Sequence, residues 1–201
     1  MREYFDTLLN TINDSINNLD LERFEELSNE SAKVLRLGNK VIVTGLGKNV
    51  PICEKFVGTM LSFGLNATFM HTNTAVHGDL GAVHDGDLVI ILSKSGETVE
   101  SLYLLDQLKK RRVSIWGITF SAESSLARNA MKTLIVKMDH EGDKWDIVPN
   151  NSTTLYLIIL QALAIELANV LGVTLDDFRM NHPGGCLLYT SDAADDLTRV
   201  D

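Results

Sequence analysis

The chain has 201 residues, of which 45% are hydrophobic and 22% charged, enough apolar sequence for a soluble domain with a buried core. Its formal net charge of −9 argues against a nucleic-acid partner and against an anionic membrane surface. Only two cysteines are present, the N-terminus is polar, and no apolar run is read as long enough to span a bilayer, so we expect a cytoplasmic protein.

Two amphipathic helices are predicted ahead of the first strand, over residues 3–17 and 20–37. Apolar residues recur at helical spacing in both, Asp20 is an N-cap candidate, and Gly38 is a stop signal. Helices in this position often provide packing or oligomer surface, so no chemistry is assigned to them.

Strands and helices then alternate along the chain. Apolar runs predict strands at 40–44, 66–70, 89–92, 114–119 and 133–137, and helical patterns follow at about 51–63, up to 108, 152–171 and 174–180. This alternation predicts an α/β fold, a three-layer αβα sandwich around a five-stranded parallel sheet of flavodoxin type. Ligands of such sheets bind beyond the carboxyl ends of the strands.

The stretch Val89–Glu100 carries the main functional signal. Its apolar strand runs directly into Ser93, Ser95, Gly96 and Thr98, and a helix follows. Such a turn directs hydroxyls, backbone N–H groups and the helix N-terminus at one point, which favours a phosphate. The alternative is a turn whose hydroxyls only cap the helix.

Gly45-Leu-Gly-Lys48 follows the first predicted strand. Gly45 and Gly47 would let the backbone approach a ligand closely, and Lys48 is placed to meet a phosphate or a sugar oxygen, with a solvated lysine as the alternative. A nicotinamide dinucleotide is disfavoured because Val50 stands where a third glycine would be.

His71 and His77 bracket the polar loop after the second strand. They are candidates for substrate contact or proton transfer, and hydrogen bonding within the loop is the alternative. Their spacing fits no metal-binding helix face, so no metal site is predicted. Because Thr44–Lys48, His71–His77 and Ser93–Thr98 all follow strand ends, we expect them to converge at one edge of the sheet.

Two later motifs also point to a site. Ser152, Thr153 and Thr154 open the most apolar helix and provide a second anion-facing N-terminus. After the final helix, a Pro-Gly-Gly turn holds His182 in place, and a simple chain reversal is the alternative.

Together these motifs resemble a sugar isomerase (SIS) domain, and more closely the arabinose 5-phosphate isomerase family, the KpsF/GutQ group. The matching motifs, in chain order, are Gly45–Lys48, His77–Gly81, Ser93–Thr98, Ser152–Thr154 and His182–Gly185. The resemblance implies interconversion of D-ribulose 5-phosphate and D-arabinose 5-phosphate through an enediol, without a cofactor. It also implies a homotetramer with shared active sites, in which a histidine reaches a neighbouring subunit's site.

The resemblance also implies site residues. The catalytic positions would be Lys48, Glu100, Glu141 and His182. Lys48 suits oxyanion stabilisation, and Glu100 or Glu141 suits proton transfer at carbon if burial raises its pKa. Glu97, which lies in the turn itself, is a rival candidate to Glu100 for this role. The substrate-binding positions would be Gly45, Gly47, His71, His77, Ser93, Ser95, Gly96, Glu97, Thr98, Ser152 and Thr153.

Two other functions stay open. The same fold serves as a non-catalytic sugar-phosphate sensor in transcription regulators, and related isomerases act on other ketose phosphates. The run Asp143-Lys-Trp-Asp146 departs from the Cys-Pro-Leu-Gly-type sequence of many relatives, and we expect it to line the sugar's side of the pocket.

We therefore divide the chain into N-terminal helices over 1–38, an SIS domain over 39–185, and a tail over 186–201. The tail resembles a translated sequencing adapter, so it is expected to be artefactual, or otherwise an acidic disordered tail. The paired regulatory CBS modules of many relatives do not follow in this sequence.

Overall fold

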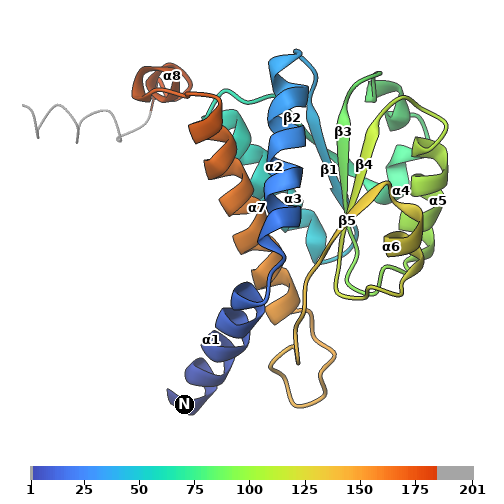
Figure 1. The fold of residues 1–201 in the computed structure, drawn as a ribbon, viewed down its shortest axis with the longest axis vertical. Helices are drawn as coiled ribbons and strands as arrows, with labels where there is room; N and C mark the ends of the chain where they lie inside the picture. Colours follow the sequence, from blue (N-terminus) through green and yellow to red (C-terminus); the bar gives the residue numbers. More distant parts are fainter. Residues whose placement is uncertain (1, 185–201) are drawn as a thin grey trace, which may run out of the picture.

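Five parallel strands form the centre of the fold in the computed structural model, which describes residues 2–184 (Figure 1). In the order in which they lie in the sheet, they are β2 (Ala67–His71), β1 (Val41–Gly45), β3 (Leu88–Leu92), β4 (Ser114–Thr119) and β5 (Lys132–Ile135). Every residue of β1 and β3 is buried, as expected for strands covered on both faces, and this explains their uninterrupted small or apolar sequence. The predicted five-stranded parallel sheet is confirmed.

Helices cover both faces of the sheet (Figure 1). One face is covered by α2 (Leu21–Arg36), α3 (Asn49–Ser62) and α7 (Asn151–Val170), and α1 (Arg2–Asn17) packs against α7. The other is covered by α4 (Thr72–Ala75), α5 (Val99–Leu108) and α6 (Ser125–Asn129). Alternate residues of β3 serve the two cores, because Ile90 packs on the first side and Ile91 on the second.

The helix boundaries follow the sequence signals closely. Asp20 caps α2 by accepting a hydrogen bond from the backbone N–H of Arg23 at 2.9 Å, and Thr174 opens α8 (Leu175–Met180) with a capping box. The expected polar loop after β2 contains two short helical segments instead, α4 and the 3-10 turn η1 (Asp79–Ala82). Both are too short to show a periodic apolar pattern.

The expectation that no apolar run is long enough to span a bilayer is wrong for the central helix α7. By length and composition this helix of 20 residues would be able to cross a membrane. In the fold, Leu155, Tyr156 and Leu160 are fully buried, and the Tyr156 hydroxyl donates to the Ile118 carbonyl at 3.0 Å. The apolar character of α7 is therefore explained by its packing against α1, α2 and α3 and by its contact with the sheet.

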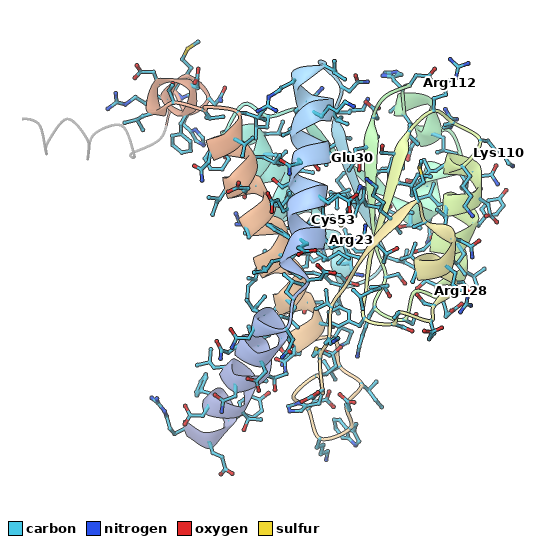
Figure 2. All side chains as sticks on the ribbon, viewed as in Figure 1. Arg23, Glu30, Cys53, Lys110, Arg112 and Arg128 are labelled. Atoms are coloured by element: carbon cyan, nitrogen blue, oxygen red, sulfur yellow. The ribbon has the colours of Figure 1, made fainter. Side chains whose placement is uncertain are left out.

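Although the chain is acidic overall, it contains a basic run, Lys109–Arg112, at the end of α5. All four side chains are exposed, and Figure 2 labels Lys110 and Arg112 on that side of the molecule. Arg112 faces Asp85 at 3.7 Å. Positive charge at this position interacts favourably with the partial negative charge of the helix C-terminus.

Candidate active site

Three of the predicted loops leave the sheet at the same edge. Gly45, at the end of β1, pairs in register with His71 on one side and with Leu92 on the other. The chain continues from these strand ends into Gly45–Lys48, His71–His77 and Ser93–Thr98. The expected convergence of the three loops is therefore present in the backbone register.

The turn after β3 is built from hydroxyl groups. The Ser93 hydroxyl lies 3.0 Å from the Thr98 hydroxyl and accepts a hydrogen bond from the Gly96 N–H at 3.2 Å. The Ser95 hydroxyl accepts from the Glu97 N–H at 3.2 Å. Thr98 occupies the N-cap position of α5 but makes no side-chain capping bond. The capping alternative therefore does not account for its hydroxyl, and the helix N-terminus keeps its capacity for an anion.

Gly96 has a backbone reason to be glycine. Its φ is +65°, and a Cβ at this position would lie 2.5 Å from the Cβ of Ser124. Neighbouring Glu97 turns to α6, where its carboxylate accepts from the Ser125 N–H at 2.6 Å. This bond holds the pKa of Glu97 below its ordinary value. Glu97 is thus occupied as a cap of α6, which weakens its case as a base.

The loop after β1 places Lys48 on the surface, at the N-cap position of α3 and without a side-chain capping bond. Gly45 is explained by packing, since a Cβ there would lie 2.8 Å from the Cβ of Asn49. Gly47 is explained by its φ of +61°, with no atom within 4 Å of a Cβ added there. Both glycines have local reasons that do not involve a ligand.

The histidines of the β2 loop differ from each other. His71 makes a hydrogen bond within its own loop, which was the alternative to substrate contact. Its Nδ1 accepts the N–H of Asn73 at 3.3 Å and so caps α4. Its ring also meets Phe69 edge to face. His77 is exposed, so its side chain is accessible from solvent.

Glu141 is the buried acid at this edge, with no exposed side-chain surface. Its carboxylate accepts hydrogen bonds from the backbone N–H groups of Asn150 and Ser152 at 3.0 and 2.9 Å, and from the Ser152 hydroxyl at 2.6 Å. It also pairs with the Lys94 ammonium at 2.6 Å. Glu141 therefore fills the N-terminus of α7, which the sequence suggested for a bound anion.

These contacts decide the charge of Glu141. Burial by itself would raise its pKa, but the bonds from Lys94, Ser152 and Asn150 outweigh burial and hold the pKa below the ordinary value of 4.5. A role as carbon base was tied to a raised pKa, and that condition is contradicted. Ser152 is buried and bonded to Glu141, while the Thr153 hydroxyl donates to the Asn150 carbonyl at 2.9 Å.

Lys94 is the residue that sequence reasoning missed. It stands inside the hydroxyl turn, between Ser93 and Ser95, and its partner Glu141 is far along the chain. A lysine flanked by two serines directly after a buried strand was the available signal, because a phosphate site in an acidic protein needs local positive charge.

Glu100 and His182 lie in very different places. Glu100 is exposed in the first turn of α5, beside the hydroxyl turn. His182 follows α8, where its Nδ1 lies 2.8 Å from the Phe178 carbonyl oxygen and its ring stacks on Phe178. Asn181 donates to the Ser62 carbonyl at the far end of α3, so α8 packs at the opposite edge of the sheet. Figure 1 shows α8 at the top, while α7 begins near the bottom. One chain therefore does not bring His182 to Lys48 and Glu100.

Asp143 orders the loop before α7 through hydrogen bonds to the loop backbone. The Asp143 carboxylate accepts backbone N–H groups of Trp145, Ile147 and Val148 at 2.9 to 3.0 Å. Trp145 is 64% exposed and reaches solvent. Of the run expected to line the sugar's side of the pocket, Asp146 borders a hollow beside the hydroxyl turn.

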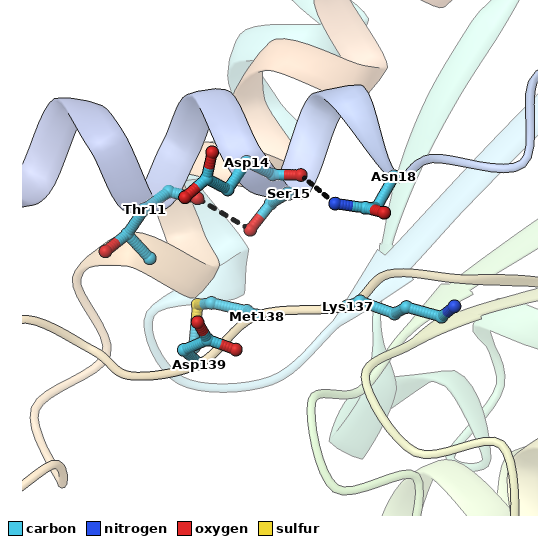
Figure 3. Close-up of a pocket in the computed structure, with 7 residues that line it drawn as sticks. All are labelled: Thr11, Asp14, Ser15, Asn18, Lys137, Met138 and Asp139. Carbon is cyan, nitrogen blue, oxygen red and sulfur yellow. Dashed lines mark hydrogen bonds between the residues drawn. The ribbon is translucent and has the colours of Figure 1, made fainter.

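That hollow has a volume of about 450 Å³. Its lining comes from the β3 turn, the β4 loop and the segment after β5: Lys94, Ser95, Phe120, Ser121, Met138, Asp139, His140 and Asp146. A second hollow of about 210 Å³ lies between α1 and the segment after β5 (Figure 3). None of the predicted site residues lines it, and its Ser15 and Asn18 side chains donate to backbone carbonyls of α1.

Comparison with known proteins gives the family. The sequence profile of the SIS domain matches residues 35–166. Arabinose 5-phosphate isomerase KdsD of Salmonella typhi is 41% identical over 155 residues, which are 77% of this chain and 47% of that protein. A solved structure of an E. coli CFT073 protein in complex with arabinose 5-phosphate has a TM-score of 0.82 and 34% identity, covering 90% of this chain and 95% of that one.

More distant structures share the fold alone. The sugar isomerase domain of an RpiR transcription factor from Sphaerobacter thermophilus has a TM-score of 0.70 at 18% identity, covering 89% of this chain and 93% of that one. The chain spans about half the length of the curated relatives it matches. Since the profile covers more than half of the sequence and the parallel sheet agrees with it, the chain belongs to the SIS domain family.

Proposed function

We propose that the chain is an aldose–ketose isomerase that interconverts D-ribulose 5-phosphate and D-arabinose 5-phosphate. The observation that carries the proposal is the hydroxyl turn Ser93–Thr98 at the N-terminus of α5, whose Thr98 hydroxyl is not used for capping. The choice of sugar is supported by the relative named arabinose 5-phosphate isomerase and by the structural neighbour in complex with that sugar phosphate.

In this proposal, the hydroxyls of Ser93, Ser95 and Thr98 and the first N–H groups of α5 hold the phosphate. The isomerisation moves one proton from C2 of the aldose to C1, and a second between the two oxygens, with no net redox change. Glu100 transfers the proton at carbon, because it is the acid beside the turn whose carboxylate, unlike those of Glu97 and Glu141, caps no helix. It is exposed in the single chain, so the burial that this role needs would come from the bound sugar and a neighbouring subunit. Lys48 stabilises the oxyanion of the enediol.

The assembly is part of the same proposal. His182 lies at the opposite edge of its own sheet, so its participation requires a second copy of the chain. We place it, together with exposed His77, at contacts between subunits of a cytoplasmic homotetramer with shared active sites.

The test is turnover of D-arabinose 5-phosphate by the 201-residue chain and by Lys48→Ala. We expect ribulose 5-phosphate formation by the first and a loss of about 100-fold or more in kcat for the variant, since a preorganised charge at the oxyanion is removed. Lys110→Ala, at the basic run remote from the site, is the matched control and should keep full activity.

Binding of sugar phosphates without turnover would contradict the isomerase and favour the sensor. Turnover of a different ketose phosphate would keep the reaction class and overturn the sugar. Full activity in Lys48→Ala would overturn the role of that lysine.

A further inference from the structure

Lys94 leaves the hydroxyl turn and reaches a different segment of the chain. Its backbone is fixed, because its carbonyl accepts hydrogen bonds from the Thr119 hydroxyl and the Phe120 N–H, each at 3.0 Å. Its side chain is 42% exposed and ends 2.6 Å from Oε1 of Glu141. The turn that we assign to the phosphate is thus tied directly to the buried acid.

The same carboxylate oxygen has a second partner. Oε1 of Glu141 accepts the Ser152 hydroxyl at 2.6 Å, while Oε2 accepts the N–H groups of Asn150 and Ser152. The Lys94 ammonium and the Ser152 hydroxyl therefore lie side by side on one oxygen. One carboxylate joins the two segments that the sequence pattern assigned to phosphate, the β3 turn and the start of α7.

The charges at this junction matter for an anionic ligand. An unpaired buried carboxylate beside the hydroxyl turn would repel a phosphate, and the low local dielectric would make that repulsion strong. Lys94 cancels the charge of Glu141, while the exposed part of its side chain borders the hollow that also contains Ser95. With the pair intact, Glu141 adds no net negative charge against a phosphate at the N-terminus of α5.

We propose that Lys94 and Glu141 form a charge-balanced brace that sets the affinity of the β3 turn for a phosphate monoester. Lys94 is a positioning residue in this arrangement, because it acts through Glu141 rather than on the reacting carbons. The inference rests on the proposed sugar-phosphate site and adds to it a determinant of affinity in the chain's own Ser-Lys-Ser sequence.

The test uses binding of inorganic phosphate, measured by calorimetry on the 201-residue chain, with Lys94→Met, Glu141→Gln and the double variant. Lys94→Met leaves Glu141 unbalanced and should raise the Kd by about ten-fold. Glu141→Gln leaves Lys94 as a free cation and should lower the Kd by about three-fold. The double variant restores neutrality, so its Kd should return to near that of the unchanged chain.

Two further variants separate charge from folding. Lys94→Arg keeps the positive charge and should bind phosphate like the unchanged chain. Lys110→Met removes a lysine remote from the site and should have no effect. In turnover, Lys94→Met should raise KM for D-arabinose 5-phosphate and leave kcat nearly unchanged, because uniform binding of the phosphate is what it loses.

Opposite shifts in the two single variants are the signature of the brace. Equal weakening in both, or an unchanged Kd in Lys94→Met, would overturn it. A double variant as weak as Lys94→Met would also overturn it, because Lys94 would then be contacting phosphate itself. If the unchanged chain neither binds phosphate nor turns over, the proposed function fails as well. If it does both and the opposite shifts are missing, only the brace fails.

Discussion

At the scale of single residues, Glu141 shows how partners decide the behaviour of a buried acid. Burial favours the neutral form, but four contacts to the ionised carboxylate reverse that preference. The outcome is a fixed negative charge at a helix N-terminus, which stabilises the fold. The same side chain without Lys94 and Ser152 would suit proton transfer, so its residue type alone does not settle its role.

The stability supplied by Glu141 should depend on pH in a definite direction. Because folding lowers its pKa from 4.5, its contribution is fully present above that value and is lost as pH falls through the lower pKa of the folded state. Urea unfolding of the unchanged chain and of Glu141→Gln should therefore show a stability difference at pH 7 that shrinks below pH 4.5. A difference that grows on acidification would contradict the assigned direction.

At the scale of elements, the two glycine turns at the carboxyl edge have different tolerances. Gly96 and Gly47 have nearly equal positive φ values, of +65° and +61°, so both carry the same backbone penalty for a larger residue. The two glycines differ in the space available for an added Cβ. A Cβ on Gly96 meets Ser124 and Thr119, whereas nothing lies within 4 Å of a Cβ on Gly47.

This matched pair predicts a graded loss of stability. Gly47→Ala should cost about 1 kcal/mol of unfolding free energy, from backbone strain alone. Gly96→Ala should cost about 3 kcal/mol, because the turn must also move away from β4 and α6. Urea denaturation at pH 7 measures both. Equal losses would show that the turn between β3 and α5 yields freely, which would weaken its description as a preformed phosphate site.

At the scale of the whole molecule, the sequence predicted what depends on local pattern. Uninterrupted apolar runs such as Val89–Leu92 predicted buried parallel strands, and parallel strands bring their loops to one edge. Contacts between segments far apart in the chain could not be predicted from local pattern. Lys94 meets Glu141 only because the folded chain brings the β3 turn to the start of α7, and that contact, together with the bonds from Ser152 and Asn150, outweighs the rise in the pKa of Glu141 expected from burial. The position of α8 likewise depends on its packing against α3.

The position of His182 leads to the last prediction, which concerns the assembly. If Lys48 of one chain and His182 of another complete each site, Lys48→Ala and His182→Ala should each be inactive alone. Co-expressed in equal amounts, they should recover about a quarter of the unchanged activity, since random pairing of chains leaves that share of sites with both residues. Light scattering would verify that the mixed protein is oligomeric. Recovery requires sites shared between chains, because no single chain in the mixture carries both residues. An active monomer, or mixed oligomers without any recovery, would show that His182 does not act across a subunit boundary, and α8 would then have only its packing role against the end of α3.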